Sequence, residues 1–129
     1  MIHEEICTYE VAKLAKEKGF NVPTHFAYNE NCRRAMYMEL CLNRNTKDSR
    51  SISAPSQSLL QRWLREEKGI HISINYQQGV DEECPSYDYS VYRWPINTEA
   101  FVSEEWKDGY STYELALEDA LKYALENLV

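Results

Sequence analysis

The chain has 129 residues, of which 43% are hydrophobic and 27% are charged, with four glycines, four prolines and a formal net charge of −7. This ordinary composition excludes a disordered or a fibrous protein, and no apolar run reaches the roughly 18 residues that a membrane span requires. The length predicts a single globular domain over residues 1–129 that needs neither a disulfide nor a metal for stability.

The start of the chain and its cysteines predict the compartment. Met1–Glu5 carries two glutamates where a signal peptide would be basic, so we expect a cytoplasmic protein. No C-x-x-C pair occurs, and a reducing compartment then predicts free thiols without an assigned role. These thiols are Cys7, Cys32, Cys41 and Cys84.

The charge is divided unevenly along the chain. Residues 1–54 carry 8 Lys and Arg against 7 Asp and Glu, whereas residues 55–129 carry 6 against 14. A basic middle therefore precedes an acidic end. We interpret the basic middle and the acidic end mainly as solvated surface. The acidic total charge is not typical of a dedicated nucleic-acid binder.

The first half of the chain predicts a helix and two strands. Thr8 is suited to cap a helix that ends at Lys18, because Gly19 can adopt the left-handed conformation just past the last turn. A short strand is expected at 25–28 and a second at 36–42, where apolar and polar residues alternate. Residues 43–53 offer almost nothing to bury and are expected to be irregular.

The second half predicts a longer series of elements. Pro55 suits the first turn of a helix that runs to Lys68, with Trp63 as a buried anchor. Strands are expected at 70–77, at 87–94 and, more weakly, near 100–102, followed by an aromatic loop at 106–110. Ser111 and Glu114 form a capping box that opens a last helix reaching Leu128.

These elements predict an α+β fold of the order αββαββ(β)α. Short turns and alternating faces favour a mainly antiparallel sheet of about four to five strands with three helices packed on it. The phrases Leu14–Phe20 and Leu64–Ile70 share the pattern in which a helix ends at a glycine and a strand begins. This raises the question of whether 8–42 and 56–94 are two copies of one unit, which the sequence leaves open.

No motif of catalysis, metal binding or cofactor binding is recognised. The three histidines have neither the helical i, i+4 spacing of a zinc site nor a cysteine two to four residues away. The four glycines are isolated, so no phosphate loop is present. A nucleophilic pair such as Cys32 with His25 stays open, because catalytic partners are often distant in sequence, but nothing at either residue supports it. We therefore expect no catalytic, cofactor or metal residues.

The helix over 55–68 has the features of a binding surface. Arginines, amides and hydroxyls near a helix N-terminus are the groups from which anion and nucleic-acid contacts are made. If the protein has a binding site, we expect it beside this helix. The candidate binding residues are Gln57, Arg62, Arg65 and His71.

Three blocks of sequence resemble a known family. Ala12–Phe20, the Pro-Ser-Gln to Trp-Leu-Arg-Glu block of 55–66, and Tyr110–Glu114 resemble small uncharacterised proteins of Bacteroides-type gut bacteria and of their phages and prophages. The resemblance touches the start, middle and end of the chain. It implies a mobile-element setting and a small accessory or regulatory role, and it carries no catalytic residue to this chain.

Three classes of function follow from these observations. The first is a non-enzymatic interaction protein that binds a protein partner, through a Tyr- and Trp-bearing surface or the helix after the 43–54 loop. The second is a ligand-binding protein or an enzyme with its site at the N-terminus of the helix over 55–68. The third is a nucleic-acid-associated protein or a DNA mimic, with the acidic half imitating a phosphate backbone. No membrane partner is expected, and the sequence does not indicate the oligomeric state.

Overall fold

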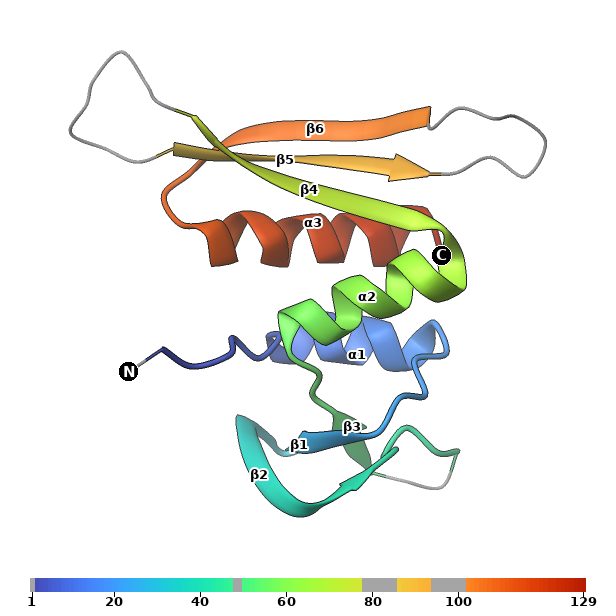
Figure 1. Cartoon of the computed structure of the whole chain (residues 1–129). Helices are drawn as coiled ribbons and strands as arrows, with labels where there is room; N and C mark the ends of the chain where they lie inside the picture. Colours follow the sequence, from blue (N-terminus) through green and yellow to red (C-terminus); the bar gives the residue numbers. More distant parts are fainter. Residues whose placement is uncertain (1, 48–49, 78–85, 94–101) are drawn as a thin grey trace. The chain divides into compact units, whose positions relative to one another are not determined.

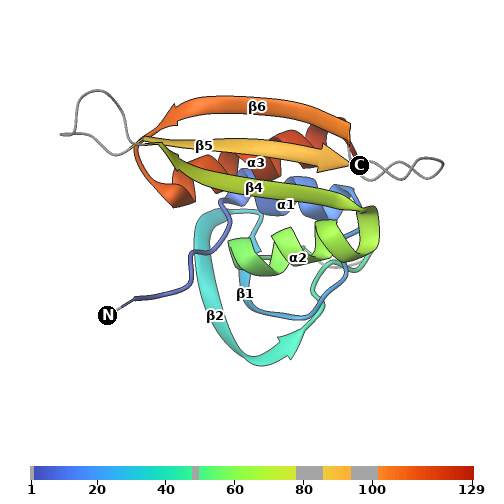
Figure 2. The same cartoon turned by 45° about the horizontal axis from the view of Figure 1, so that its top comes forward.

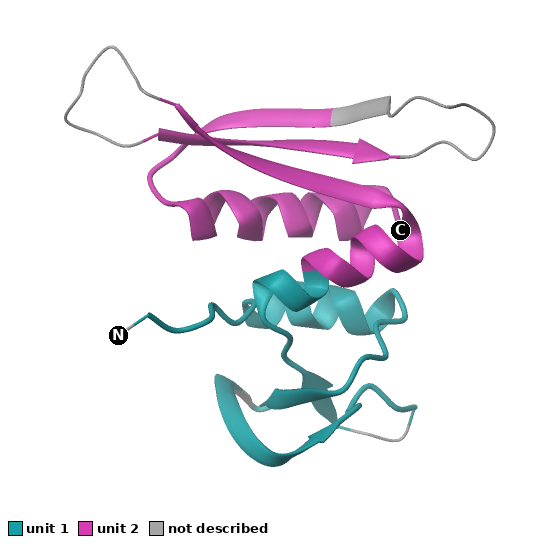
Figure 3. Ribbon diagram, viewed as in Figure 1, with its two compact units in different colours: residues 1–60 teal, residues 61–129 magenta. Residues whose placement is uncertain are grey.

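The structure is a computed structural model that describes residues 2–47, 50–77, 86–93 and 102–129. The described residues contain three helices and six strands in the order α1, β1, β2, β3, α2, β4, β5, β6, α3 (Figure 1). They form two compact units, Met1–Leu60 and Gln61–Val129 (Figure 3).

Helix α1 (Tyr9–Glu17) begins after the predicted cap Thr8 and ends one residue before the predicted Lys18, which is its C-cap. The Thr8 side chain accepts a hydrogen bond from the backbone N–H of Val11 at 3.4 Å. At the other end Gly19 has a φ of 93°, and the Phe20 N–H donates to the Ala15 carbonyl at 2.9 Å. This is the pattern in which a glycine closes a helix and the next apolar residue folds back toward it, and Phe20 is indeed buried.

The first unit holds a three-stranded antiparallel sheet. Strands β1 (Thr24–Asn29), β2 (Cys32–Leu42) and β3 (Ser51–Ser53) lie in the order β2-β1-β3. The expectation that all of 43–53 is irregular is therefore wrong for its last three residues. A single apolar side chain explains the difference, because Ile52 is only 4% exposed and its burial places this short segment beside β1.

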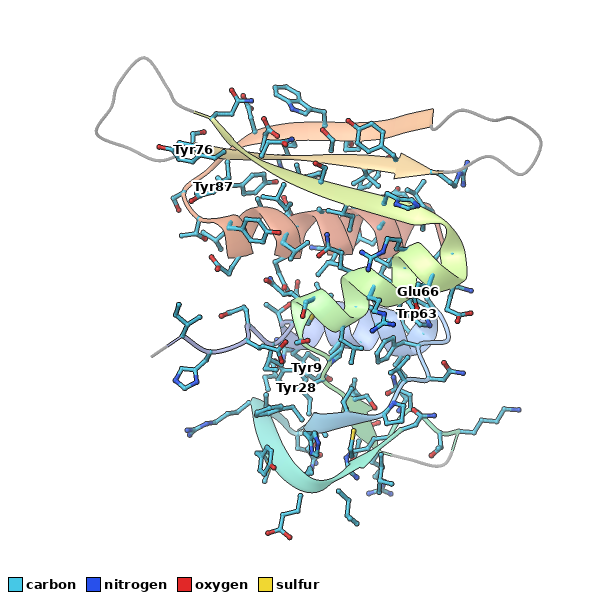
Figure 4. All side chains as sticks on the ribbon, viewed as in Figure 1. Tyr9, Tyr28, Trp63, Glu66, Tyr76 and Tyr87 are labelled. Atoms are coloured by element: carbon cyan, nitrogen blue, oxygen red, sulfur yellow. The ribbon has the colours of Figure 1, made fainter. Side chains whose placement is uncertain are left out.

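The core of the first unit joins α1 to its sheet. Ala12 of α1 clusters with Tyr28 of β1, with Ile52 and with Ala54. Tyr28 also donates a hydrogen bond from its hydroxyl to the Cys7 carbonyl at 2.7 Å, and its ring meets Tyr9 edge to face at 5.6 Å (Figure 4). The sheet is thus anchored to the segment before α1 as well as to the helix.

Helix α2 (Gln57–Lys68) crosses the boundary between the two units. The Ser56 hydroxyl accepts from the Leu59 N–H at 3.2 Å and so caps the helix. Trp63 is 6% exposed, which confirms it as a buried residue, and Gly69 again takes a left-handed conformation, with a φ of 66°.

The second unit holds the other three-stranded antiparallel sheet, with helix α3 (Tyr113–Asn127) along one face (Figures 1 and 2). Its strands β4 (Ile70–Gln77), β5 (Ser86–Arg93) and β6 (Val102–Tyr110) lie in sequence order. The expected loop at 106–110 is wrong, because these residues continue β6 and Trp106 pairs with Ser90. Pairing with a central strand overrides the weak strand propensity of this charged segment.

The N-terminus of α3 differs from the prediction by one residue. Thr112, and not Ser111, is the cap, and its hydroxyl accepts from the Leu115 N–H at 3.1 Å. The buried residues of α3 recur at helical spacing, as expected for a helix on a sheet. They are Ala116, Leu117, Ala120, Leu121, Ala124 and Leu125.

The two faces of the second sheet differ in character. Tyr87 meets Tyr113 of α3 at 6.3 Å, so the odd-numbered residues of β5 face the helix, and the even-numbered ones face the opposite side. On that opposite side the Asp88 carboxylate is 1% exposed and accepts hydrogen bonds from two β4 amides, those of Asn75 at 2.9 Å and of Gln77. These two bonds join neighbouring strands side chain to side chain.

The α+β class and the three helices agree with the prediction, and the order αββαββ(β)α fits except that β3 adds a strand before α2. The prediction of one sheet of four to five strands is wrong, because the described residues contain six strands in two sheets of three. Among the described residues, no helix is both long enough and apolar enough to span a bilayer.

Candidate interaction surface

Strand β2 exposes a row of large apolar side chains. Met36 is 54% exposed, Tyr37 is 62%, Leu40 is 67% and Leu42 is 46%. Single exposed apolar residues are normal on a protein surface, whereas four on one strand are a feature that indicates an interaction site.

The shape of β2 explains why these side chains are exposed. Between the pairs Thr24↔Leu42 and Phe26↔Tyr37, β1 advances two residues while β2 advances five, and a second irregularity follows before Asn29↔Cys32. Such bulges bend a strand and interrupt its alternation of faces. Strand β2 curves strongly as a result (Figures 1 and 2), and its apolar side chains do not all lie over the core of the first unit.

Basic side chains flank the apolar row. Arg33 and Arg34 are exposed at the start of β2, and the Arg33 guanidinium lies 5.2 Å from the centre of the Tyr9 ring. Arg44 follows the strand and donates from Nη2 to the Leu40 carbonyl at 2.8 Å. Glu39 is the one acidic residue among 32–47, so the apolar row lies in a basic setting.

A hollow of about 550 Å³ opens beside the same strand, within the first unit. It lies at the N-terminus of α2, where Ser56 and Leu59 form part of its wall. The remaining lining residues are Ile2, His3, Glu4, Ile6, Pro23, Thr24, His25, Phe26, Cys41 and Ala54. Its walls are mainly apolar with a few polar groups, which is the usual composition of a binding pocket.

Strand pairing brings His25 and Cys41 to the same hollow. The pair Thr24↔Leu42 places β1 and the end of β2 side by side. The His25 ring stacks on Tyr37 at 5.7 Å, and its Nδ1 lies 3.1 Å from the Met38 carbonyl, which fixes the ring in place. Sequence reasoning considered His25 with Cys32 instead, and the side chain of Cys32 lies outside the described residues.

The titratable groups of the hollow do not form a metal site. Within residues 2–47, 50–77, 86–93 and 102–129, no group of three His, Cys, Asp or Glu side chains is arranged to hold an ion. The polar groups at α2 are engaged with one another, since Ser58 donates to Glu4 at 3.3 Å and Ser56 and Ser58 share a contact at 3.3 Å. The hollow is therefore suited to an apolar group with a few hydrogen bonds.

The four predicted binding residues are spread over both units. Gln57 in the first unit is 4% exposed, and its backbone N–H donates to the Glu5 carbonyl at 2.8 Å. Arg62 forms an exposed ion pair with Glu66, Nε to Oε1 at 3.0 Å. Arg65 is exposed on α2, and His71 is half-buried on β4 opposite Tyr92.

None of these four is among the residues that line the hollow in the described part of the chain. The residues that do line it at α2 are the neighbours Ser56 and Leu59. Nothing in the sequence indicated that His25 and Cys41 lie at this helix end, because only the pairing of β1 with β2 brings them there.

Comparisons with known proteins add no family to this description, since no family model, no curated protein and no solved structure matches the chain.

Proposed function

We propose that the chain is a small, non-enzymatic interaction protein that binds a partner protein through strand β2. The binding face, here called the β2 surface, consists of Arg33, Arg34, Met36, Tyr37, Leu40 and Leu42. The observation that carries the proposal is the exposure of four large apolar side chains on this one strand, each by 46% or more. Apolar side chains of this size bring most of the free energy of binding when a partner removes them from water.

The chemistry of the surface defines the partner. Arg33 and Arg34 would pair with carboxylates, because charges across an interface are normally complementary. The hollow beside β2 would take one apolar side chain of the partner. We therefore propose a protein segment that carries an apolar anchor between acidic residues.

Side chains, rather than backbone pairing, would make the contact. The two irregularities of β2 and its arginines are features by which proteins keep an edge strand from pairing with another strand. The partner would accordingly lie across the side chains of the β2 surface. The family resemblance supports a setting in a phage or another mobile element for this accessory role.

A peptide-display selection tests the proposal with a defined probe. A random 12-residue library is selected against the full wild-type chain, and the selected peptides are synthesised and titrated by fluorescence anisotropy. We expect sequences rich in Asp, Glu and large apolar residues, with an affinity that falls as salt is raised. Leu40→Glu should weaken binding at least about tenfold, because it places a charge in the apolar row.

Leu115→Glu is the matched control. Leu115 is 54% exposed on α3 of the second unit, so the substitution has the same chemistry on a different surface. It should change the affinity less than about twofold. Selection of no peptide, or equal effects of the two substitutions, would contradict the proposal. Tighter binding of a DNA duplex than of any peptide, lost in Arg33→Glu, would favour the nucleic-acid alternative.

The hollow supports a second candidate function, the binding of a small ligand at the N-terminus of α2. The supporting observation is that Ser56 and Leu59 of this helix end share a cavity of about 550 Å³ with His25 and Cys41. A fragment screen by NMR would test it. Fragments that shift the signals of Thr24, His25 and Cys41, equally in wild type and in Leu40→Glu, would favour a ligand site. Fragments that shift none of these signals would exclude it.

A further inference from the structure

The two sheets have four outer strands, and three of them are protected against pairing. Strand β2 has two irregularities and two arginines, and β3 has three residues. Strand β6 has two irregularities against β5 and carries charges at Glu105, Lys107 and Asp108. Bulges, charges and short length are the features with which natural proteins protect an exposed sheet edge.

Strand β4 has none of these protections. It pairs with β5 at eight consecutive positions, from Ile70↔Arg93 to Gln77↔Ser86, without an irregularity. Its sequence, IHISINYQ, contains no Lys, Arg, Asp or Glu, although residues 61–129 carry 6 basic and 14 acidic residues. A regular, uncharged edge in an acidic unit is the kind of strand that pairs with another strand.

The backbone groups at the outer edge of β4 can be assigned. The Ile72 carbonyl accepts a hydrogen bond from Gln61 Nε2 of α2 at 3.0 Å, so this carbonyl points away from β5. Because backbone groups alternate along a strand, the N–H and C=O groups of Ile74 and Tyr76 point the same way. Helix α2 thus covers the first half of the edge, and the described residues give the second half no pairing strand.

The side chains of this second half are exposed as well. Tyr76 is 61% exposed, and its ring meets Tyr87 edge to face at 5.4 Å (Figure 4). Asn75 and Gln77 are exposed on the other face, where their amides bond the Asp88 carboxylate. These two bonds hold the end of β4 flat against β5, so the edge is preorganised for a partner strand.

We propose that a second copy of the chain pairs with this edge, strand β4 against strand β4, antiparallel and centred on Asn75. In this register Ile74 of each copy lies opposite Tyr76 of the other, and the two residues exchange both backbone hydrogen bonds. Asn75 of one copy lies opposite Asn75 of the other. The β4–β5–β6 sheet of one copy then joins the same sheet of the other copy to form a single six-stranded sheet, with both α3 helices on the same face.

Two features select a second copy over another strand. The antiparallel arrangement about a two-fold axis makes each strand its own complement, and it uses the carbonyl of Ile74 rather than that of Ile72, which α2 already occupies. The absence of charge removes the like-charge repulsion that would oppose self-pairing. Strand β6, with its acidic residues, would repel its own copy. The inference does not depend on the β2 surface.

Sedimentation of the full chain gives the first test. We expect a concentration-dependent equilibrium between one copy and two. Tyr76→Pro removes an N–H that points away from β5, so the β4–β5 ladder is preserved, while each copy loses the bond that this N–H donates to the Ile74 carbonyl of the other copy, two bonds in the dimer. The dissociation constant should rise about 10- to 30-fold relative to Tyr76→Ala, which removes the same ring but keeps the N–H.

Cross-linking gives a second test that does not depend on proline. In a background with Cys32, Cys41 and Cys84 replaced by serine, Asn75→Cys places two thiols opposite each other, about 4.5 Å apart at Cα, within the range of a disulfide. Oxidation should join two copies. Gln77→Cys, whose opposite residue is Ser73, should not cross-link at a comparable rate. A chain that sediments as a monomer at millimolar concentration, equal effects of Tyr76→Pro and Tyr76→Ala, or equal cross-linking at both positions would overturn the proposal.

Discussion

Replacing Asp88 should destabilise the second unit, because its carboxylate joins β4 to β5. The side chain is 1% exposed and accepts from the amides of Asn75 and Gln77, one on each oxygen. Asp88→Ala removes both acceptors. It also frees the register of β4, since a shift by one residue would turn both amides to the α3 face.

The expected magnitude follows from the two bonds and from the exposure of their donors. A hydrogen bond to a charged group contributes about 1.5–3 kcal/mol. Asn75 and Gln77 are exposed, so their amides regain water in the variant, and removing the carboxylate also removes the cost of burying it. We therefore expect Asp88→Ala to lower the free energy of unfolding by about 2 kcal/mol, which is less than the roughly 3–6 kcal/mol that two such bonds contribute without these two compensating effects.

Urea unfolding followed by tryptophan fluorescence measures this change. With a slope of about 2 kcal/mol per molar urea, the midpoint should fall by about 1 M at an unchanged slope. Asp108→Asn is the control, because Asp108 is exposed on β6, and its midpoint should stay within about 0.25 M of wild type. A wild-type midpoint for Asp88→Ala, or an equal loss in the control, would refute a role for the buried carboxylate.

Three further measurements check other parts of the structure. Trp63→Ala, at a side chain 6% exposed, should lower the free energy of unfolding by about 3–5 kcal/mol in the same assay. Gly19→Ala should lower it by about 1–2 kcal/mol; a Cβ there meets no atom within 4 Å, so the whole effect comes from the φ of 93°. Burial, with the charges of Glu105 and Asp119, raises the pKa of Tyr89 to about 12, and burial with the Asp119 hydrogen bond raises the pKa of Tyr110 further. The stability that these tyrosines contribute should be present below pH 10 and lost as the pH rises toward 12. Ultraviolet titration of the double variant Tyr89→Phe/Tyr110→Phe should show two fewer tyrosines that ionise only at high pH.

Local signals predicted the helices and the central strands well. Gly19 and Gly69 end α1 and α2 in the left-handed conformation, and the alternation of residues 70–77 gave β4 its correct bounds. These features depend on neighbours in sequence, which is why they can be found without an alignment.

The elements that were missed, β3 and all but the start of β6, depend on distant pairing. Strand β6 contains Glu105, Lys107 and Asp108, and no periodicity identifies it until β5 lies beside it. Strand β3 has one buried residue, Ile52. The division into two sheets follows from which strands pair, and strand order is not encoded in the pattern of any single strand.

The candidate site shows the same limit. The predicted residues Gln57, Arg62, Arg65 and His71 were chosen for their neighbourhood in sequence, whereas β2 exposes its apolar row because of irregularities that arise against β1. Alternation alone predicted a strand with one apolar face, and such a face is usually buried. Their exposure is the feature that the sequence could not reveal.

An NMR titration tests the proposed interaction most directly. A selected acidic peptide with an apolar anchor is added to the 15N-labelled full chain, and the backbone amide shifts are followed to saturation. Binding through the β2 surface predicts that the largest changes fall at Arg33, Arg34, Tyr37, Leu40 and Leu42, and that Leu40→Glu needs at least about tenfold more peptide to reach half of them. Changes confined to β4, β5, β6 or α3, or an unchanged titration midpoint in Leu40→Glu, would contradict binding through this strand.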